Sequence, residues 1–489
     1  MNVLVIDVGT SSMRGILYRE NTDKIAYCQI KYHPRYHANG ELEQAAEEFE
    51  KSCLLIIREI SARAKEKKKE IHAVALTAQR SSVVPVDGKR IPLMPVIMWQ
   101  DTRNHDTCKE LETYQSEIVK RSGARINTVF SGGKMSWLKQ TRPDIYQKAE
   151  KLVNIPEYLI HLMTGEYVTD HTYGSRSNLM NLETCCWDSV LLDIFGIDRK
   201  KLCRLQPPGS ICGTITADFA EKSGLKKGIP VITAGGDQQC AAVGQGAFQE
   251  GRLSIVTGTG AFLVTTCGRI PENLSGDVVC NCSAVKGKYI IETNVLSCCS
   301  AFDWFCRNFY DWDKIDYNRI NRELQSAADM QEQCLTLPYF QGRSTPVWNA
   351  EARASIHNIT LGSTRTDILK SLVEGIFLEI RNNIELLKGF TKIKEAYIGG
   401  GMTNSAVMNQ MQADIYGMPV YHREDAESTA LGALMVALNG LGICDGYEGI
   451  FQKILEKNAG EFYECKADRY LFYNYKQNEM NQLYKKIYE

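Results

Sequence analysis

Short apolar runs alternate with helix-spaced apolar stripes along the chain, which is the pattern of an α/β protein. One stripe predicts a helix, and its members are Phe49, Cys53, Leu54, Ile56, Ile57 and Ile60. The run at residues 65–70 is typical of a solvated helix end, and residues 72–76 predict a strand that enters a sheet. The alternation returns in the second half, where residues 396–398 predict a strand and residues 429–439 a helix.

Two Gly-Thr turns interrupt the apolar runs, one in each half of the chain. The first spans residues 7–14 and the second residues 257–260, each between two short apolar segments. Each predicts a β-hairpin whose turn exposes backbone N–H groups. Glycine lets the main chain approach an anion closely, and the neighbouring hydroxyls add donors. Two such turns facing each other predict a polyphosphate, and hence a nucleotide, held between two halves of the chain.

An aspartate between the two turns is a candidate for chemistry. Residues 231–233 predict a strand, two glycines and Asp237 follow, and residues 241–243 begin a helix. Open α/β sheets place their chemistry at the carboxyl ends of strands, and glycines there make room for a ligand. An aspartate at a helix start can also be a simple N-cap. From these residues alone, both roles of Asp237 stay open.

Length and charge narrow the class of protein. A chain of 489 residues is too long for one ordinary core, and we expect two domains, residues 1–246 and 247–489. The formal net charge of -1 argues against a nucleic-acid partner. No run reaches the roughly 20 apolar residues of a transmembrane helix, so a membrane partner is not expected.

The 17 cysteines raise the question of disulfides or metal. No secretory signal is visible, because the apolar run at residues 3–6 is short and leads directly into the first turn. We therefore expect a cytoplasmic protein with reduced thiols. The tightest group, Cys280, Cys282, Cys298 and Cys299, lacks the C-x-x-C pairs of zinc sites, and buried thiols are the default. These four also suggest an alternative, an iron–sulfur ATPase.

Six segments occur in an order and spacing that match a known family. They are residues 7–10, 99–103, 236–239, 257–260, 339–358, and 399–401 together with 427–433. Together they make the chain similar to the carbohydrate kinases called FGGY, from near residue 1 to about residue 442. The resemblance implies an α/β, two-domain, actin-like and ribonuclease H-like ATPase fold with ATP and sugar in the cleft between the domains. It assigns sugar and phosphate binding to the first domain and nucleotide binding to the second.

The resemblance also implies roles for single residues. Asp237 matches the general base that takes a proton from the sugar hydroxyl. Asp7 matches a second cleft carboxylate and implies a Mg²⁺ ion held partly through water, although it can also be a hairpin cap. The phosphate contacts would be Thr10, Ser11, Ser12, Arg14 and Thr259, with Arg14 as a surface strand residue in the alternative. The adenosine pocket would be lined by Gly400, Gly401, Met402 and Ser405.

The acceptor pocket departs from the family pattern. The matching positions are Arg80, Ser81, Trp99, Asp101, Asp237, Gln238 and Phe262, similar to glycerol kinases more than to xylulokinases. However, Ser81 stands where glutamate is expected and Val129 where tyrosine is expected. These changes remove hydrogen-bond partners for a small triol and free space, which favours a larger polyol or ketose. On the nucleotide side, Cys298 and Cys299 stand in a segment where glycine is usual.

The sequence therefore predicts an ATP- and Mg²⁺-dependent kinase that phosphorylates a hydroxyl of a small ketose or polyol. A glycerol kinase proper is one alternative. Another is a non-catalytic actin-like ATP-binding module, which would need neither Asp237 nor a pocket formed by Arg80 and Asp101. The oligomeric state, a homodimer included, is left open by the sequence.

Overall fold

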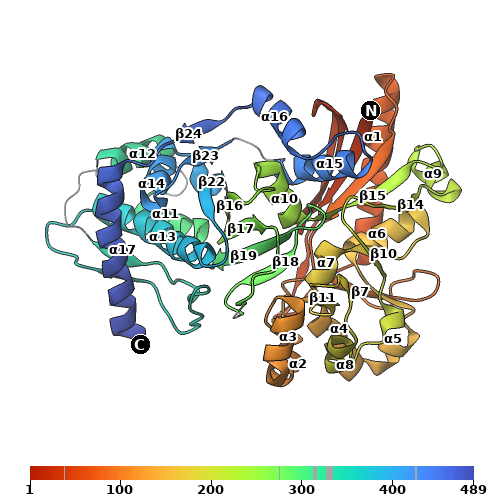
Figure 1. Cartoon of the computed structure of the whole chain (residues 1–489), viewed down its shortest axis with the longest axis horizontal. Coiled ribbons are helices and arrows are strands. Elements are labelled where there is room, and N and C mark those ends of the chain that lie inside the picture. The colour runs from red at the N-terminus through yellow and green to blue at the C-terminus, as the bar shows by residue number, and fades with distance from the viewer. Residues whose placement is uncertain (38, 275, 312–315, 327–333, 424–426) are drawn as a thin grey trace. The chain divides into compact units, whose positions relative to one another are not determined.

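The computed structural model describes residues 1–37, 39–274, 276–311, 316–326, 334–423 and 427–489 (Figure 1). The chain forms two compact units, each built from segments that are distant in sequence. Unit 1 contains Met1–Phe248, Gly268–Ile290 and Ala426–Lys457, and unit 2 contains Gln249–Cys267, Ile291–Asp425 and Asn458–Glu489. Both units combine helices with a central sheet, so the predicted α/β class is confirmed.

The central sheet of unit 1 has six strands. Their order is β14 (Ile211–Thr214), β15 (Pro230–Gly236), β6 (Ala73–Ala78), β1 (Asn2–Val8), β2 (Ser12–Arg19) and β3 (Lys24–Lys31). Strands β6 and β15 run parallel to β1, and β1, β2 and β3 are antiparallel neighbours. In register, Thr77 of β6 lies opposite Asp7 on one side and Gly235 on the other. The first turn, the residues after β6 and the residues after β15 therefore share one edge of the sheet.

Helix α1 (Ala46–Glu66) packs on β2 and β3 through the predicted apolar stripe, five of whose six members have no exposed surface. At Gly15 of β2, a Cβ atom would lie 2.2 Å from the Ile56 side chain, so glycine permits this close packing. The predicted strand at residues 72–76 is confirmed as β6.

Helices α10 (Asp237–Gln245) and α15 (Ser428–Gly440) cross at two glycines in unit 1. A Cβ atom on Gly244 would lie 2.0 Å from the Ser428 carbonyl oxygen, and one on Gly432 would lie 1.8 Å from the Cys240 carbonyl oxygen. Helix α15 confirms the helix predicted over residues 429–439. Helix α10 begins at Asp237, four residues before the predicted start at residue 241.

Smaller elements complete unit 1. A five-stranded sheet contains β4 (Arg35–Tyr36), β5 (Leu42–Gln44), β8 (Val96–Ile97), β7 (Val83–Val86) and β9 (Lys151–Asn154). Further strands are β10 (Val168–Asp170) with β13 (Arg204–Gln206), β11 (Met180–Asn181) with β12 (Cys186–Trp187), and β18 (Val279–Cys282). The other α-helices are α2 (His105–Leu111), α3 (Gln115–Ser122), α4 (Ser131–Thr141), α5 (Pro143–Lys148), α6 (Ile155–Thr164), α7 (His171–Ser175), α8 (Ser189–Phe195), α9 (Ala217–Ser223) and α16 (Glu448–Lys457).

The central sheet of unit 2 repeats the local arrangement of unit 1. Its strands include β19 (Tyr289–Val295), β17 (Ala261–Cys267), β16 (Gly251–Thr257), β22 (Ile393–Gly400), β23 (Val420–His422) and β24 (Glu461–Tyr463). Strands β16 and β17, like β1 and β2, form a hairpin closed by a Gly-Thr turn, and its first strand pairs in parallel with a third strand, here β22. Each unit therefore places one Gly-Thr turn at the carboxyl end of a buried parallel strand.

Helices and two short strands complete unit 2. They are α11 (Cys299–Phe309), α12 (Tyr317–Ser326), α13 (Arg365–Lys388), α14 (Ala406–Tyr416), α17 (Ala467–Tyr488), β20 (Leu335–Leu337) and β21 (Ser355–His357). The strand predicted at residues 396–398 is confirmed within β22. Among the residues that the structure describes, no helix combines the length and apolar character needed to cross a membrane.

Candidate functional site

The first Gly-Thr turn closes the hairpin of β1 and β2, as predicted. The Gly9 amide donates a hydrogen bond to the Ser12 carbonyl oxygen at 2.9 Å. The Gly9 carbonyl in turn accepts hydrogen bonds from the Tyr32 hydroxyl at 2.6 Å and the Gln79 side-chain amide at 3.3 Å. The turn is therefore fixed by the residue directly after β3 and by the residue directly after β6.

Hydroxyl groups surround this turn. Trp99 Nε1 donates a hydrogen bond to Thr10 Oγ1 at 3.0 Å, and Ser12 Oγ accepts one from Gln29 Nε2 at 3.0 Å. Ser11 is exposed at the tip. Three hydroxyls that the sequence assigned to phosphate binding thus lie on consecutive residues of one rigid turn.

Asp7 and Arg14 are direct neighbours across the hairpin and form an ion pair. Asp7 is buried, and burial raises the pKa of its carboxyl group while the Arg14 guanidinium opposes that shift. The sequence analysis assigned Asp7 to a metal ion and Arg14 to a phosphate, and it did not predict their ion pair. The pair was predictable, because Asp7 and Arg14 lie at matching positions before and after the turn, and opposite residues of an antiparallel hairpin interact directly.

Asp237 is the first residue of α10, directly after β15. Its Oδ1 accepts a hydrogen bond from the Gln238 amide at 2.8 Å and lies 3.6 Å from Arg80 Nε. The Asp237 side chain keeps 27% of its surface exposed, whereas Arg80 keeps 9%. Gly236 holds the N-cap position, so Asp237 is not the N-cap. A Cβ atom on Gly236 would lie 2.6 Å from Arg80 Cδ, so glycine lets Arg80 reach the carboxylate.

A buried network that the sequence did not reveal fixes the end of β15. Asp170, fully buried, accepts hydrogen bonds from the Thr172 amide at 2.8 Å and from the Thr233 hydroxyl. Thr172 Oγ1 accepts one from the Gly236 amide at 2.8 Å, and the Tyr173 hydroxyl donates to the Gly235 carbonyl at 2.9 Å. The only local signal was Asp170 as the N-cap of α7, because the other partners are distant in sequence.

Ser81 and Trp99 lie in the loops beside Arg80. Ser81 has a positive φ of 70° and is buried, and its hydroxyl donates to the Arg176 carbonyl at 3.2 Å. The Arg176 guanidinium stacks over the Phe130 ring at 4.6 Å from the centroid. The Trp99 amide donates to Ser82 Oγ at 2.9 Å, which joins the two loops.

Asp101 has no exposed surface, and Arg103 and the Leu42 amide occupy its carboxylate oxygens. These contacts favour a structural role over an acceptor contact. Lys134 is equally buried and donates to the carbonyls of Trp99 and Val129, each at 3.2 Å, and of Thr128. Burial lowers the pKa of Lys134 to about 7.

The second Gly-Thr turn, in unit 2, closes the predicted hairpin of β16 and β17. The Gly258 amide donates to the Gly260 carbonyl at 2.7 Å. The amides of Cys298 and Cys299, at the start of α11, donate to the carbonyls of Thr259 and Gly258 at 2.8 and 2.9 Å. Helix α11 therefore holds this turn from outside the hairpin.

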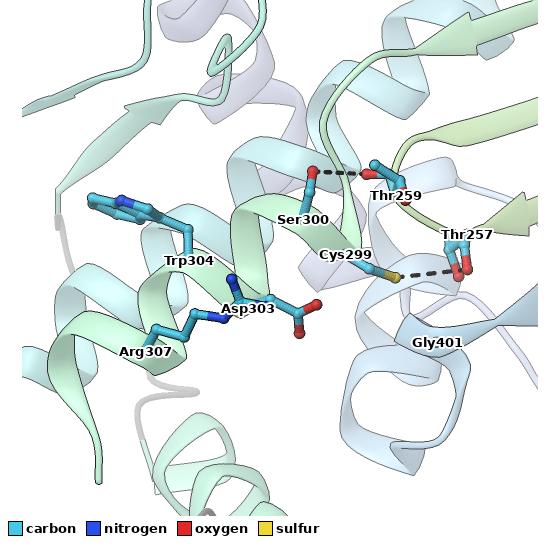
Figure 2. A pocket seen from close by; sticks show the side chains of 9 residues that line it. Thr257, Thr259, Cys299, Ser300, Asp303, Trp304, Arg307 and Gly401 are labelled. Carbon is cyan, nitrogen blue, oxygen red and sulfur yellow. Dashed lines mark hydrogen bonds between the residues drawn. The ribbon is translucent and has the colours of Figure 1, made fainter. Parts of the chain in front are cut away.

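A cavity of about 530 Å³ adjoins this turn (Figure 2). It is lined by Thr257, Gly258, Thr259, Cys299, Ser300, Asp303, Trp304, Arg307 and Gly401. The sequence had placed the turn at residues 257–260, the segment around Cys298 and Cys299, and Gly401 on the nucleotide side, but it did not reveal Asp303 or Arg307. Figure 2 shows Asp303, Trp304 and Arg307 extending from α11, and their helical spacing was the signal that marked one lining face.

The other predicted nucleotide residues do not line this cavity, and two of them, Gly400 and Met402, contact Thr257 in its wall. Gly400 has a φ of 97°, and a Cβ atom there would lie 2.0 Å from the Thr257 carbonyl oxygen. Met402 is buried, and its amide donates to Thr257 Oγ1 at 3.2 Å. Ser405 caps α14 and donates to Asn321 Oδ1 at 2.7 Å. Phe262, on β17, is 41% exposed.

The residues present fit a magnesium ion that arrives with a nucleotide. In the part of the chain that the structure describes, no three His, Cys, Asp or Glu side chains converge as a metal cage. Mg²⁺ is commonly held by one or two carboxylates together with substrate phosphates and water, and it needs no such cage. The Asp7 carboxylate beside the hydroxyls of the first turn meets that requirement.

The four cysteines that suggested an iron–sulfur site do not lie in one unit. Cys280 and Cys282 belong to unit 1, and Cys298 and Cys299 belong to unit 2.

Comparison with known proteins shows similarity along almost the whole chain. Residues 2–244 match the N-terminal domain of the FGGY family of carbohydrate kinases, and residues 253–440 match its C-terminal domain. Glycerol kinase of Thermococcus onnurineus is 31% identical over 461 residues, which cover 92% of this chain and 90% of that protein. Glycerol kinase 2 of Thermotoga maritima is 31% identical over 463 residues, which cover 91% and 90%.

Solved structures agree with this similarity. The structure of Plasmodium falciparum glycerol kinase with ADP matches with a TM-score of 0.90 and 25% identity, covering 100% of this chain and 98% of that chain. Ligand-bound xylulose kinase from Lactobacillus acidophilus matches with a TM-score of 0.92 and 22% identity, covering 99% and 98%. These likenesses confirm the two-domain ATPase fold expected from the sequence.

Proposed function

The chain belongs to the FGGY family of carbohydrate kinases, and we propose that it transfers the γ-phosphoryl group of ATP to a hydroxyl of a small ketose or polyol. The observation that carries this proposal is the position of Asp237. Its partly exposed carboxylate lies at the carboxyl edge of the sheet, beside Arg80 and on the same edge as the first Gly-Thr turn. A kinase needs a base and phosphate donors close together.

Asp237 acts as the general base in this proposal. Its carboxylate accepts the proton of the acceptor hydroxyl as that oxygen attacks the γ-phosphorus in line with the leaving oxygen. Arg80 Nε, 3.6 Å from Asp237 Oδ1, helps to orient the carboxylate. At the end of β15 the Gly236 amide donates to Thr172 and the Gly235 carbonyl accepts from Tyr173, and these hydrogen bonds keep the base in place, which a positioned reaction requires.

Each unit supplies its own nucleotide contacts in this proposal. Thr10, Ser11 and Ser12 of the first turn and Thr259 of the second contact the phosphates. The adenosine occupies the cavity beside α11, with Gly401 in its wall, Gly400 and Met402 in contact with Thr257 of that wall, and Ser405 at the start of α14. The ADP of the Plasmodium relative supports a nucleotide in this family. For the two domains predicted from the sequence, we propose that residues 1–246 bind mainly the acceptor and the phosphates, and that residues 247–489 bind mainly the nucleotide.

Asp7 would hold Mg²⁺ in this proposal, with Arg14 as the partner of Asp7 before the ion arrives. When bound, Mg²⁺ neutralises phosphate charge and helps align the triphosphate. The Asp7 carboxylate is buried, and burial raises its pKa, so an adjacent cation favours its ionised form. Arg14 lies at the edge of the turn and can contact a phosphate when Asp7 binds the ion.

Arg80, Trp99, Gln238 and Phe262 are the proposed acceptor contacts. Ser81 and Asp101 act mainly through their neighbours, because the Ser81 hydroxyl is bonded to Arg176 and the Asp101 carboxylate to Arg103. A serine at position 81 and a valine at position 129 leave few polar partners for a triol, which supports a four- to six-carbon acceptor. Glycerol is the second candidate, because relatives about 30% identical are glycerol kinases.

An ADP-release assay over a panel of acceptors tests the proposal. The panel contains glycerol, a tetritol, a pentitol, a pentulose and a hexulose, each with ATP and Mg²⁺. We expect a four- to six-carbon acceptor to exceed glycerol in kcat/KM by about tenfold or more. If glycerol gives the highest value, the second candidate is correct. If no sugar or polyol stimulates ADP release, the kinase assignment fails.

Location and assembly are further parts of the proposal. Small sugars or polyols are the proposed partners, and the many cysteines support a reducing, cytoplasmic location. A homodimer is the simplest assembly to test. Sedimentation equilibrium across a concentration series distinguishes it from a monomer.

A further inference from the structure

Two thiols of unit 1 lie in direct contact outside the proposed active site. Cys185 occupies the turn between β11 and β12, and Cys282 ends β18. Their sulfur atoms are 3.9 Å apart, in direct contact, and a disulfide requires them to approach to roughly 2.05 Å. Cys282 is buried and Cys185 is half-buried. One thiol is therefore open to a small reagent while the other is shielded behind it.

The surroundings of Cys185 favour its reactive thiolate form. Cys185 lines a cavity of about 610 Å³ together with the basic side chains Lys151, His171, Arg199 and Arg204. Hydrogen bonds from the Cys282 thiol and from His171 lower the pKa of Cys185 well below that of an ordinary thiol. A thiolate is the nucleophilic form of cysteine, and nearby cations stabilise it. Cys185 is thus the attacking sulfur and Cys282 its partner.

Helix α7 connects this thiol pair to the residues around Asp237. Its first residue, His171, lines the same cavity as Cys185, and its last, Ser175, accepts a hydrogen bond from the Cys282 amide at 3.1 Å. Between them, Thr172 holds the Gly236 amide, one residue before Asp237. A displacement of α7 would therefore shift Gly236 through Thr172 and, with it, the neighbouring Asp237.

We propose that Cys185 and Cys282 form a peroxide-sensitive dithiol whose disulfide, acting through α7, lowers the kinase's efficiency with its acceptor. In the first step the Cys185 thiolate attacks hydrogen peroxide, the O–O bond breaks, and the products are a Cys185 sulfenic acid and hydroxide. In the second, the Cys282 sulfur attacks the Cys185 sulfur, the S–O bond breaks, and water leaves with the Cys282 proton. Peroxide is reduced and the two thiols are oxidised, so electrons balance. The effect on activity rests on the proposed kinase function, whereas disulfide formation does not.

Peptide mapping tests the disulfide without any activity assay. The reduced full-length protein is treated with hydrogen peroxide, alkylated and digested with trypsin, which releases residues 177–199 and 270–286 as separate peptides. Each peptide contains a second cysteine, Cys186 or Cys280, so Cys186→Ser and Cys280→Ser serve as matched controls. We expect a cross-linked peptide pair in the wild type and in both controls, and none in Cys185→Ser or Cys282→Ser. Cys282→Ser should instead accumulate a sulfenic acid at Cys185 that dimedone traps.

Failure of the cross-link in the wild type, or its persistence in Cys185→Ser, would overturn the dithiol. For the effect on activity, oxidation should lower acceptor kcat/KM by about 3- to 100-fold, as expected for a small displacement of the base. The KM for ATP should stay constant, dithiothreitol should restore activity, and Cys185→Ser should resist peroxide. A disulfide that forms with kcat/KM unchanged overturns the coupling through α7. If the untreated enzyme phosphorylates no acceptor, the proposed function fails, and the peptide map still decides the dithiol.

Discussion

The crossing of α10 and α15 predicts that Gly432→Ala damages catalysis from a distance. The added Cβ would lie 1.8 Å from the Cys240 carbonyl oxygen and 2.9 Å from the Gly244 amide nitrogen, both backbone atoms of α10. Backbone atoms cannot rotate away as a side chain can. To reach the 3.4 Å of an ordinary contact from 1.8 Å, the two helices must separate by about 1.6 Å. Helix α10 begins with Asp237, so the base moves with it.

Two effects of this separation can be measured. Overpacking of this kind costs about 1–3 kcal/mol of stability. A displacement of a catalytic group by about 1 Å can lower the rate by about 10²-fold. We therefore expect a lower unfolding temperature and a kcat reduced by about 30- to 100-fold. The KM for ATP should change little, because the cavity beside α11 belongs to the other unit.

Gly449→Ala is the matched control, because a Cβ atom there has no neighbour within 4 Å. Gly449 lies in the first turn of α16, and its substitution leaves the crossing of α10 and α15 unchanged. Steady-state ADP release and thermal unfolding are measured for both variants and the wild type. A Gly432→Ala enzyme with wild-type kcat would refute the link between this crossing and the base.

Three further predictions concern single residues of unit 1. Asp7→Ala should raise the Mg²⁺ concentration for half-maximal activity by about tenfold, and an unchanged titration would leave Asp7 as a hairpin residue paired with Arg14. Gly236→Ala should displace Arg80, because the new Cβ would lie 2.6 Å from Arg80 Cδ and 2.8 Å from Arg80 Cγ, and it should lower acceptor kcat/KM by about tenfold. Burial lowers the pKa of Lys134 to about 7, whereas an unfolded lysine keeps its proton to about pH 10.4. The unfolded state therefore binds more protons between these values, so this lysine makes stability rise with pH from 7 to 10, and Lys134→Met should flatten that rise in thermal unfolding.

Local patterns predicted the parts of the fold that depend on local physics. The apolar stripe of α1 and the two Gly-Thr hairpins were correctly predicted, because helical spacing and turn chemistry are set within a few residues. The start of α10 was placed too late, because Asp237 to Cys240 show no apolar periodicity and the helix is fixed by packing against α15.

Long-range contacts account for what the sequence did not reveal. The hydrogen bond between the Gly236 amide and Thr172 joins residues that are 64 positions apart in the sequence. The hydrogen bond from the Leu42 amide to Asp101 joins residues that are 59 positions apart. No local pattern encodes such pairs. The Asp7–Arg14 pair is different, because hairpin symmetry alone sets them opposite each other and could have predicted the contact.

The substitution Asp237→Asn tests the central claim most directly. It keeps the shape of the side chain and its hydrogen bond with the Gln238 amide, but it removes the proton acceptor. With the best acceptor of the panel, we predict a kcat lower by about 10²- to 10⁴-fold, with ATP affinity in equilibrium binding unchanged within about twofold. Wild-type turnover by Asp237→Asn would contradict the assignment of Asp237 as the base and, with it, the proposed mechanism.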